Sequence, residues 1–215
     1  MRFETVLFDL DGTLLYTLPD MALALNRALT LHGHPPRTLR EIRSFVGNGV
    51  RKLVERSLPA GAEDMETVYQ DYEAWYSLHG ADHVEFYSGV PELIASLRER
   101  GIRTGVVTNK THPAAEAMIR RFFGDGMDVT EGKRPGRPTK PSPDAVWDAM
   151  AALGAQRETT LYVGDSGVDA ETARNAGIRC VLADWGYRDR AELERCGALA
   201  VISRPAELLK YLEVE

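Results

Sequence analysis

Apolar positions change their spacing along the chain, and the second half shows the clearest pattern. From Val90 onward, stretches with apolar residues at helical spacing alternate with short runs rich in β-branched residues. Leu93 and Leu97 predict a helix over 91–100, and residues 102–107 predict the strand after it. The following units repeat this order, with helices predicted at 112–123, 146–153 and 169–175 and strands at 127–130, 160–163 and 178–182. Such alternation is typical of an α/β fold, a parallel sheet with helices on both faces.

The segment between Leu15 and about Tyr87 differs, because it contains helical patterns and no convincing strand. The helices predicted there are Pro19–Leu31, Leu39–Phe45, Val50–Leu58 and Glu63–Leu78, with glycine and proline residues between them. A strand beginning at Val6 precedes this segment. We therefore predict a core domain of residues 1–14 and 88–215 and an inserted helical domain of residues 15–87. An insertion at this point can cover the carboxyl ends of the strands, where open α/β sheets bind ligands.

The composition is typical of a globular protein but does not indicate a function. The 215 residues are 44% hydrophobic and 27% charged, as in ordinary soluble globular proteins. A net charge of -6 without a long basic run argues against a nucleic-acid partner. No apolar stretch approaches the roughly 18 residues of a membrane span, and Glu4 interrupts the apolar segment that a signal peptide needs. We expect a cytoplasmic protein with no membrane partner, in which Cys180 and Cys196 are small buried residues without a disulfide.

Polar residues that can carry chemistry follow the predicted strands at their carboxyl ends. They are Asp9 and Asp11 after the first strand, Thr108 and Asn109 after the strand ending at 107, and Asp165 and Asp169 after the strand ending at 163. Lys140 lies in the loop GRPTKPSPD, before a helix whose predicted cap is Ser142 with Pro143 behind it. Because the carboxyl ends of parallel strands share one edge of a sheet, we expect these side chains to lie there together.

Taken singly, each of these residues has an ordinary structural interpretation. A carboxylate after a strand is usually a turn or helix-capping residue, and a single lysine before a helix is usually solvated. Four carboxylates at one sheet edge are different, since they repel one another and raise each other's pKa unless a cation holds them together. Magnesium binds oxygen ligands and is commonly held by one or two carboxylates together with a substrate phosphate. The combination therefore predicts a Mg²⁺ site.

Four motifs in this order resemble those of the haloacid dehalogenase-like superfamily. They are DLDGT at 9–13, VVTNK at 106–110, TKPSPD at 139–144 and YVGDSGVD at 162–169. The resemblance spans essentially the whole chain and implies a Rossmann-like core with a small α-helical cap. Within the superfamily, TLPDMALALNRAL, VGNGVRKLVERSL, FYSGVPEL and EGKRPGRPTKPSPD are most similar to phosphoglycolate phosphatases.

The resemblance implies catalytic roles for five residues. Asp9 would be the nucleophile that forms an aspartyl phosphate. Asp11 would act as general acid toward the leaving oxygen and then as general base for water. Thr108 and the backbone amide of Asn109 would hydrogen-bond the phosphoryl group, while Lys140 would neutralise it and orient Asp9.

The same resemblance implies the metal ligands and the reaction class. Magnesium would be bound by Asp9, the backbone carbonyl of Asp11, and Asp165, with Asp169 holding the ion or its waters. Relatives that resemble true dehalogenases lack the second carboxylate, because a halide leaving group needs no proton. Asp11 therefore favours phosphoryl transfer.

The predicted helical domain carries the residues expected to choose the substrate. Gly47, Asn48, Gly49 and Arg51 form a glycine-rich entry to a helix, where free amides favour an anion. By resemblance this segment lies over the active site, and Arg51 could pair with a substrate carboxylate such as that of 2-phosphoglycolate. The alternative is that Arg51 is a solvated helix residue and the glycines form a turn.

The sequence departs from the family pattern at two positions. Tyr16 and Gly167 stand where relatives commonly carry an acid, which can alter the pocket mouth and the surroundings of the metal. The favoured function is hydrolysis of a small phosphorylated metabolite, most similar to the phosphoglycolate phosphatase reaction. The alternatives are a phosphatase for another small phosphate ester or pyrophosphate, a sugar phosphomutase of the β-phosphoglucomutase type, and a non-enzymatic binding protein on the same fold. A monomer or homodimer is expected.

Overall fold

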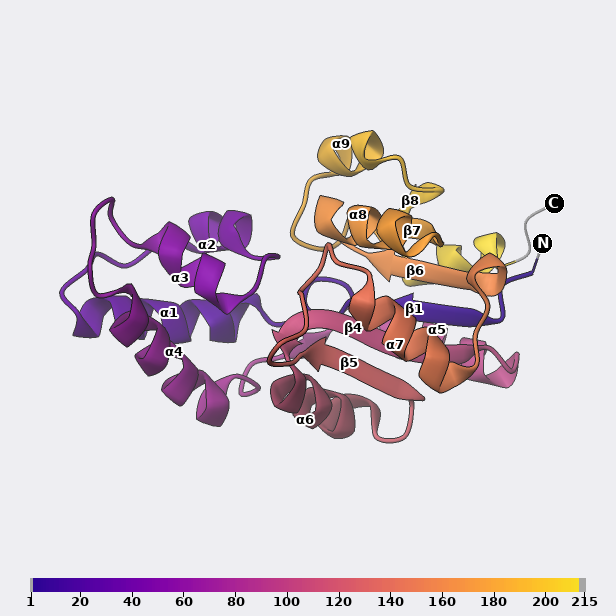
Figure 1. The fold of residues 1–215 in the computed structure, drawn as a ribbon, viewed down its shortest axis with the longest axis horizontal. Helices are drawn as coiled ribbons and strands as arrows, with labels where there is room; N and C mark the ends of the chain where they lie inside the picture. Colours follow the sequence, from indigo (N-terminus) through magenta and orange to yellow (C-terminus); the bar gives the residue numbers. More distant parts are fainter. Residues whose placement is uncertain (1, 213–215) are drawn as a thin grey trace. The chain divides into compact units, whose positions relative to one another are not determined.

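The computed structural model describes residues 2–212 and divides into two compact units (Figure 1). The first unit comprises residues 1–15 and 86–215, and the second comprises residues 16–85. These boundaries lie one and two residues from the domain boundaries predicted from the sequence (15 against 14, and 86 against 88).

The first unit is built on a six-stranded sheet in which every neighbouring pair of strands is parallel. Its strands, in spatial order, are β5 (Val129–Lys133), β4 (Arg103–Thr111), β1 (Thr5–Phe8), β6 (Thr160–Gly164), β7 (Arg179–Ala183) and β8 (Ala200–Ile202). β1 lies in the interior of the sheet and all four of its residues are buried. The predicted parallel α/β fold is confirmed. The three-residue β8 was not predicted, because it is too short to show a periodic pattern.

Helices cover both faces of this sheet (Figure 1). They are α5 (Val90–Glu99), α6 (His112–Phe123), α7 (Asp144–Leu153), α8 (Gly167–Ala176) and the short α9 (Arg190–Leu193). Leu7 and Tyr162 pack with apolar residues of α7 and α8 in one cluster. Val6 and Phe8 point to the opposite face, since side chains alternate along a strand, and they are also buried. Burial on both faces explains why β1 is a continuous apolar run.

The second unit contains four helices among the described residues. They are α1 (Leu18–Leu31), α2 (Leu39–Phe45), α3 (Val50–Ser57) and α4 (Met65–His79). Their buried faces carry Leu25, Leu29, Val54 and Tyr72. Each helix lies within two residues of its predicted limits, because glycine and proline residues mark the ends clearly.

Three local predictions are wrong. Two-residue strands, β2 (Leu15–Tyr16) and β3 (Glu85–Phe86), pair where no strand was expected, since two residues give no detectable pattern. The N-cap of α7 is Pro143 and not Ser142, whose hydroxyl instead contacts the carboxylate of Asp144. Cys180 is buried as expected, but Cys196 is only partly buried; both are free thiols.

Candidate active site

The functional residues lie where the sheet's central strands end. Asp9 directly follows β1, and its backbone N–H donates to the carbonyl of Val163 on β6 at 2.8 Å. Asp165 directly follows β6. Thr108 and Asn109 were expected just after a strand, but β4 continues through them to Thr111. The pairing of β4 with β5 shifts its register between residues 107 and 111. The backbone of β4 is therefore extended over these residues, but its pairing with β5 is irregular there.

Two glycines allow the chain to pass closely around the carboxylate of Asp165. Gly12 has φ 86°, and a Cβ at this position would clash with Asp165 and with the ring of Tyr187. A Cβ on Gly186 would clash with Asp165 and with the carbonyl of Gly12. Position 12 therefore needs glycine both for its left-handed backbone and for space.

Three of the four predicted carboxylates form one cluster. Ligand oxygens of Asp9, Asp165 and Asp169 all lie within 4.8 Å of one another. Ser166 holds Asp169 in place, because its backbone N–H donates to Oδ2 at 3.1 Å and its hydroxyl donates at 2.6 Å. The contact from the Ser166 backbone is one half of the capping box of α8, whose other half is the backbone N–H of Asp169 donating to the side chain of Ser166. The same carboxylate thus caps a helix and faces the cluster.

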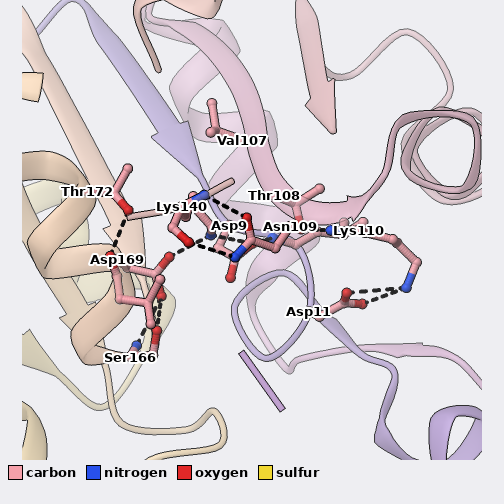
Figure 2. Close-up of polar contacts among 12 residues, drawn as sticks. Asp9, Asp11, Val107, Thr108, Asn109, Lys110, Lys140, Ser166, Asp169 and Thr172 are labelled. Carbon is pink, nitrogen blue, oxygen red and sulfur yellow. Dashed lines mark hydrogen bonds and ion pairs between the residues drawn. The ribbon is translucent and has the colours of Figure 1, made fainter. Parts of the chain in front are cut away.

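Lys140 inserts its ammonium group into this cluster. Its Nζ lies 2.9 Å from Asp9 Oδ1 and 2.7 Å from Asp169 Oδ1, and it donates to the hydroxyl of Tyr162 at 3.1 Å (Figure 2). The side chain is only 2% exposed. The carboxamide of Asn109 holds the backbone of Lys140, accepting from its N–H at 2.8 Å and donating to its carbonyl at 3.2 Å. Lys140 is therefore fixed at both its backbone and its charged end.

Burial and charge together perturb the pKa values of these groups. Burial raises the pKa of the Asp9 carboxyl from 3.8 to about 6, because attraction to Lys140 only partly offsets burial and repulsion from Asp169. Burial also raises the pKa of Asp165 well above its usual range, with repulsion from Asp169 and Asp9 adding to the effect. Burial alone would lower the pKa of Lys140, but the two neighbouring carboxylates hold it well above its usual range. The two carboxylates thus favour the cationic form of Lys140.

The side chain of Asp11 lies apart from this cluster. Both of its carboxylate oxygens accept hydrogen bonds from Lys110 Nζ, at 3.1 and 3.2 Å. Figure 2 shows this pair on a different side of Asp9 from Asp169 and Ser166. The expectation that four carboxylate side chains converge is therefore wrong for Asp11, whose carboxylate pairs with Lys110 and is not part of the cluster.

Sequence reasoning missed four contributors to the site. They are Lys110, Tyr162, Ser166 and the side chain of Asn109. The capping-box pattern of Ser166 and Asp169 could have been recognised in the sequence. Lys110, Tyr162 and Asn109 contact residues that lie 22 to 99 positions away in the sequence. No local sequence pattern predicts contacts over such separations.

Comparison with known proteins identifies the family. The sequence model for the haloacid dehalogenase-like hydrolases matches residues 6–183. The chain belongs to the haloacid dehalogenase-like hydrolase family. It is 40% identical over 190 residues to a phosphoglycolate phosphatase of Cereibacter sphaeroides, a match that covers 85% of this chain and 86% of the relative.

Other relatives agree on the reaction class of this haloacid dehalogenase-like protein. N-acetylmuramic acid 6-phosphate phosphatase of Pseudomonas aeruginosa is 31% identical over 217 residues, covering 99% of this chain and 96% of that one. The crystal structure of a predicted phosphoglycolate phosphatase from Haemophilus somnus superimposes with a TM-score of 0.91 at 26% identity, covering 99% of each chain. The protein is a phosphatase with a Rossmann-like core.

The carboxylate cluster of this phosphatase fits a divalent cation. Asp9, Asp165 and Asp169 offer hard oxygen ligands at the spacing such an ion needs. The ammonium of Lys140 contacts Asp9 and Asp169, whereas the contact made by Asp165 Oδ2 is with the backbone N–H of Tyr187, at 2.6 Å. Asp165 and Asp169 are buried and Asp9 is partly buried, and Lys140 contacts only two of these three carboxylates, so the donor set favours an additional cation.

The glycine-rich segment predicted to choose the substrate lies in the second unit. Gly47 and Asn48 form a turn, and Gly49, with φ 86°, is the N-cap of α3, so the predicted entry to a helix is confirmed. The side-chain oxygen of Asn48 accepts from Arg56 at 2.9 Å. That this segment lies over the active site stays a prediction.

Arg51 is engaged with neighbours in its own unit. Its guanidinium donates to Glu66 at 2.6 Å and lies 4.6 Å from the ring centroid of Tyr69. Of the two departures from the family pattern, Tyr16 lies in β2, and Gly167 begins α8 beside the sulfur of Cys196. No helix within residues 2–212 has the length and apolar character needed to cross a membrane.

Proposed function

We propose that this protein hydrolyses 2-phosphoglycolate to glycolate and phosphate through an aspartyl-phosphate intermediate. The observation that carries the proposal is the 40% identity to a phosphoglycolate phosphatase over 85% of this chain. The geometry of the site supports it, because a buried nucleophile, a fixed cation and a separate acid/base carboxylate lie at one sheet edge.

In the first half-reaction, the carboxylate of Asp9 attacks phosphorus and the bond to the glycolate oxygen breaks. Lys140, fixed 2.9 Å from Asp9, orients the nucleophile and offsets the charge of the phosphoryl group. Thr108, which is buried at the end of β4, and the backbone amide of Asn109 hydrogen-bond the phosphoryl oxygens. Asp11 donates a proton to the departing oxygen.

In the second half-reaction, water attacks the phosphorus of the aspartyl phosphate. Asp11, now a carboxylate, accepts the proton from that water, and the bond between Asp9 and phosphorus breaks to release phosphate. The two half-reactions replace a hydrolysis that is among the slowest known without a catalyst, for which enzymes lower the barrier by on the order of 20 kcal/mol.

We infer that the cation of this site is Mg²⁺, held by Asp9, Asp165, Asp169 and the backbone carbonyl of Asp11. When bound, the ion neutralises charge on the phosphoryl group and the carboxylates. This inference rests on the three clustered carboxylates, which bring hard oxygen ligands together inside the protein.

We infer that the second unit selects the substrate through Arg51 and the segment 47–49. A guanidinium matches a carboxylate geometrically, and the carboxylate of glycolate is what distinguishes this substrate from a simple alkyl phosphate. Arg51 is about half exposed and bound to Glu66, a weak surface ion pair that a substrate carboxylate can replace. We also infer that the protein acts in the cytoplasm on a small phosphorylated metabolite, as a monomer or homodimer.

The proposal is tested by phosphate release from a panel of esters in the presence of MgCl₂. The panel comprises 2-phosphoglycolate, N-acetylmuramic acid 6-phosphate, β-glucose 1-phosphate and pyrophosphate, and an Asp9→Asn preparation controls for contaminating phosphatases. We expect kcat/KM for 2-phosphoglycolate to exceed the others at least tenfold. A larger value for another ester, or conversion of β-glucose 1-phosphate to glucose 6-phosphate without phosphate release, contradicts the proposed substrate.

A further inference from the structure

Lys110 forms a buried ion pair with the acid/base carboxylate. Its Nζ lies 3.1 Å from Asp11 Oδ1 and 3.2 Å from Oδ2, so the ammonium group contacts both oxygens. The side chains are 5% and 13% exposed, respectively. A pair so protected from water is held far more firmly than one on the surface.

The position of Lys110 follows from the end of β4. Lys110 comes two residues after Thr108, and its backbone N–H donates to the hydroxyl of Thr108 at 3.3 Å. The strand therefore carries a phosphate-binding hydroxyl and, two residues later, the cation that holds Asp11. Asp9 and Asp11 are also two residues apart, and each carboxylate has its own cation, Lys140 for Asp9 and Lys110 for Asp11 (Figure 2).

The carboxylate of Asp11 is not a member of the cluster formed by Asp9, Asp165 and Asp169. A divalent cation bound at that cluster would attract it as a further ligand. A carboxylate captured by that cation could no longer accept a proton from water. Lys110 supplies a competing charge on the other side (Figure 2).

We propose that Lys110 is a positioning residue that holds the Asp11 carboxylate ready to act as base on the aspartyl phosphate. The inference rests on the proposed two-step mechanism. After Asp11 has given its proton to the leaving oxygen, it is a carboxylate, and the ammonium group of Lys110, 3.1 Å from its Oδ1, holds it in place. Water then attacks phosphorus, its proton passes to Asp11, and the electron pair of the broken phosphorus–oxygen bond returns to Asp9.

The test separates the two half-reactions by steady-state kinetics with p-nitrophenyl phosphate as the probe. For Lys110→Met, which keeps the length of the side chain without its charge, we expect kcat to fall about tenfold while kcat/KM changes less than threefold. This split arises because kcat/KM reports steps up to the first phosphoryl transfer, whereas kcat includes hydrolysis of the intermediate. Acid-quenched intact-protein mass spectrometry should show a larger steady-state fraction of phosphoenzyme than in the unaltered protein.

Three comparisons keep the result interpretable. Lys210→Met removes an exposed lysine of the same unit and should leave all parameters unchanged. Lys110→Arg keeps the positive charge and should lower kcat more than kcat/KM, but to a smaller extent than Lys110→Met. It replaces Lys110→Met in the experiment if the methionine variant does not fold. In an Asp11→Asn background, Lys110→Met should change kcat less than twofold, because Lys110 acts through Asp11.

Two outcomes overturn the proposal. A rise in KM at unchanged kcat means that Lys110 binds the substrate. An equal fall of kcat and kcat/KM without added phosphoenzyme means that the substitution damages the site in general. Neither depends on phosphoglycolate being the substrate. If neither the unaltered protein nor Lys110→Met nor Asp11→Asn forms any phosphoenzyme, the proposed mechanism fails. If phosphoenzyme is detected but Lys110→Met leaves its fraction unchanged, the role proposed for Lys110 fails.

Discussion

The two units contain ion pairs of similar length with opposite surroundings. In the first unit, Lys140 lies 2.9 and 2.7 Å from Asp9 and Asp169, and its side chain is 2% exposed. In the second unit, Arg51 lies 2.6 Å from Glu66, with both side chains about half exposed. Distance alone therefore does not distinguish a catalytic ion pair from a surface one.

Burial makes the difference. An exposed pair such as Arg51 and Glu66 contributes roughly 0–1 kcal/mol, because water screens it and both side chains lose freedom. In the cluster of the first unit, burial instead raises the pKa of Asp9 to about 6, because attraction to Lys140 only partly offsets it. The second unit is stabilised by apolar helix packing and by caps such as the capping box of Thr38 and Glu41. The first unit instead places three carboxylates together, a costly arrangement that is common at functional sites.

The largest effect is expected at the nucleophile of the buried cluster. Asp9→Asn keeps the size of the side chain but removes the attacking carboxylate, so kcat should fall at least about 10³-fold. Circular dichroism and thermal unfolding should show an intact fold. Substantial activity in a pure preparation of this variant would refute the aspartyl-phosphate mechanism.

Removing the divalent cation expected at the carboxylate cluster of the first unit should abolish phosphatase activity. We expect EDTA to eliminate phosphate release and MgCl₂ to restore it. Saturating MgCl₂ should also raise the Tm of the unaltered protein by about 5–10 °C, since an ion that binds only the folded state stabilises it. Asp165→Asn should lose this rise, with NaCl at equal ionic strength as the control. An equal rise in both proteins would place the ion elsewhere.

The buried cluster should also make stability depend on pH when EDTA is present. The pKa of Asp9 is raised to about 6 in the folded state from 3.8, so the folded protein binds more protons between these values. We compare the Tm of the unaltered protein with the Tm of Asp9→Asn at the same pH. The unaltered protein should lose about 5 °C relative to the variant as the pH rises from about 4 to about 6. Asp165 acts in the same direction. A relative stability that rises over this range would show that the cluster is not buried as described.

The smallest effect is expected for the exposed pair. Arg51→Ala should change the Tm by less than about 1 °C, because a surface ion pair contributes little. It should raise KM for 2-phosphoglycolate about three- to tenfold and leave KM for p-nitrophenyl phosphate unchanged. Lys52→Ala, which removes a similarly exposed pair with Glu55 on the same helix, is the matched control. An unchanged KM for both esters would exclude Arg51 from carboxylate binding.

Local sequence patterns predicted most of the elements but not every boundary. The helices α2 and α6 match their predicted limits, because Thr38, Pro113 and nearby glycines mark the ends strongly. Strand β4 extends four residues beyond its predicted end (111 against 107), since the polar residues there resemble a turn while their backbone remains extended. The strands β2, β3 and β8 were not predicted, because two or three residues are too few to show an alternation of apolar and polar positions.

Spacing along the chain was enough to predict the α/β alternation, the helical insertion, and the positions of Asp9 and Asp165 directly after buried strands. Which charges meet depended on the folded chain. It turned Asp11 toward Lys110, placed Lys140 against Asp9, and buried the hydroxyl of Tyr162 among them. Such choices depend on the order of strands in the sheet and on exclusion of water, which are properties of the folded chain as a whole.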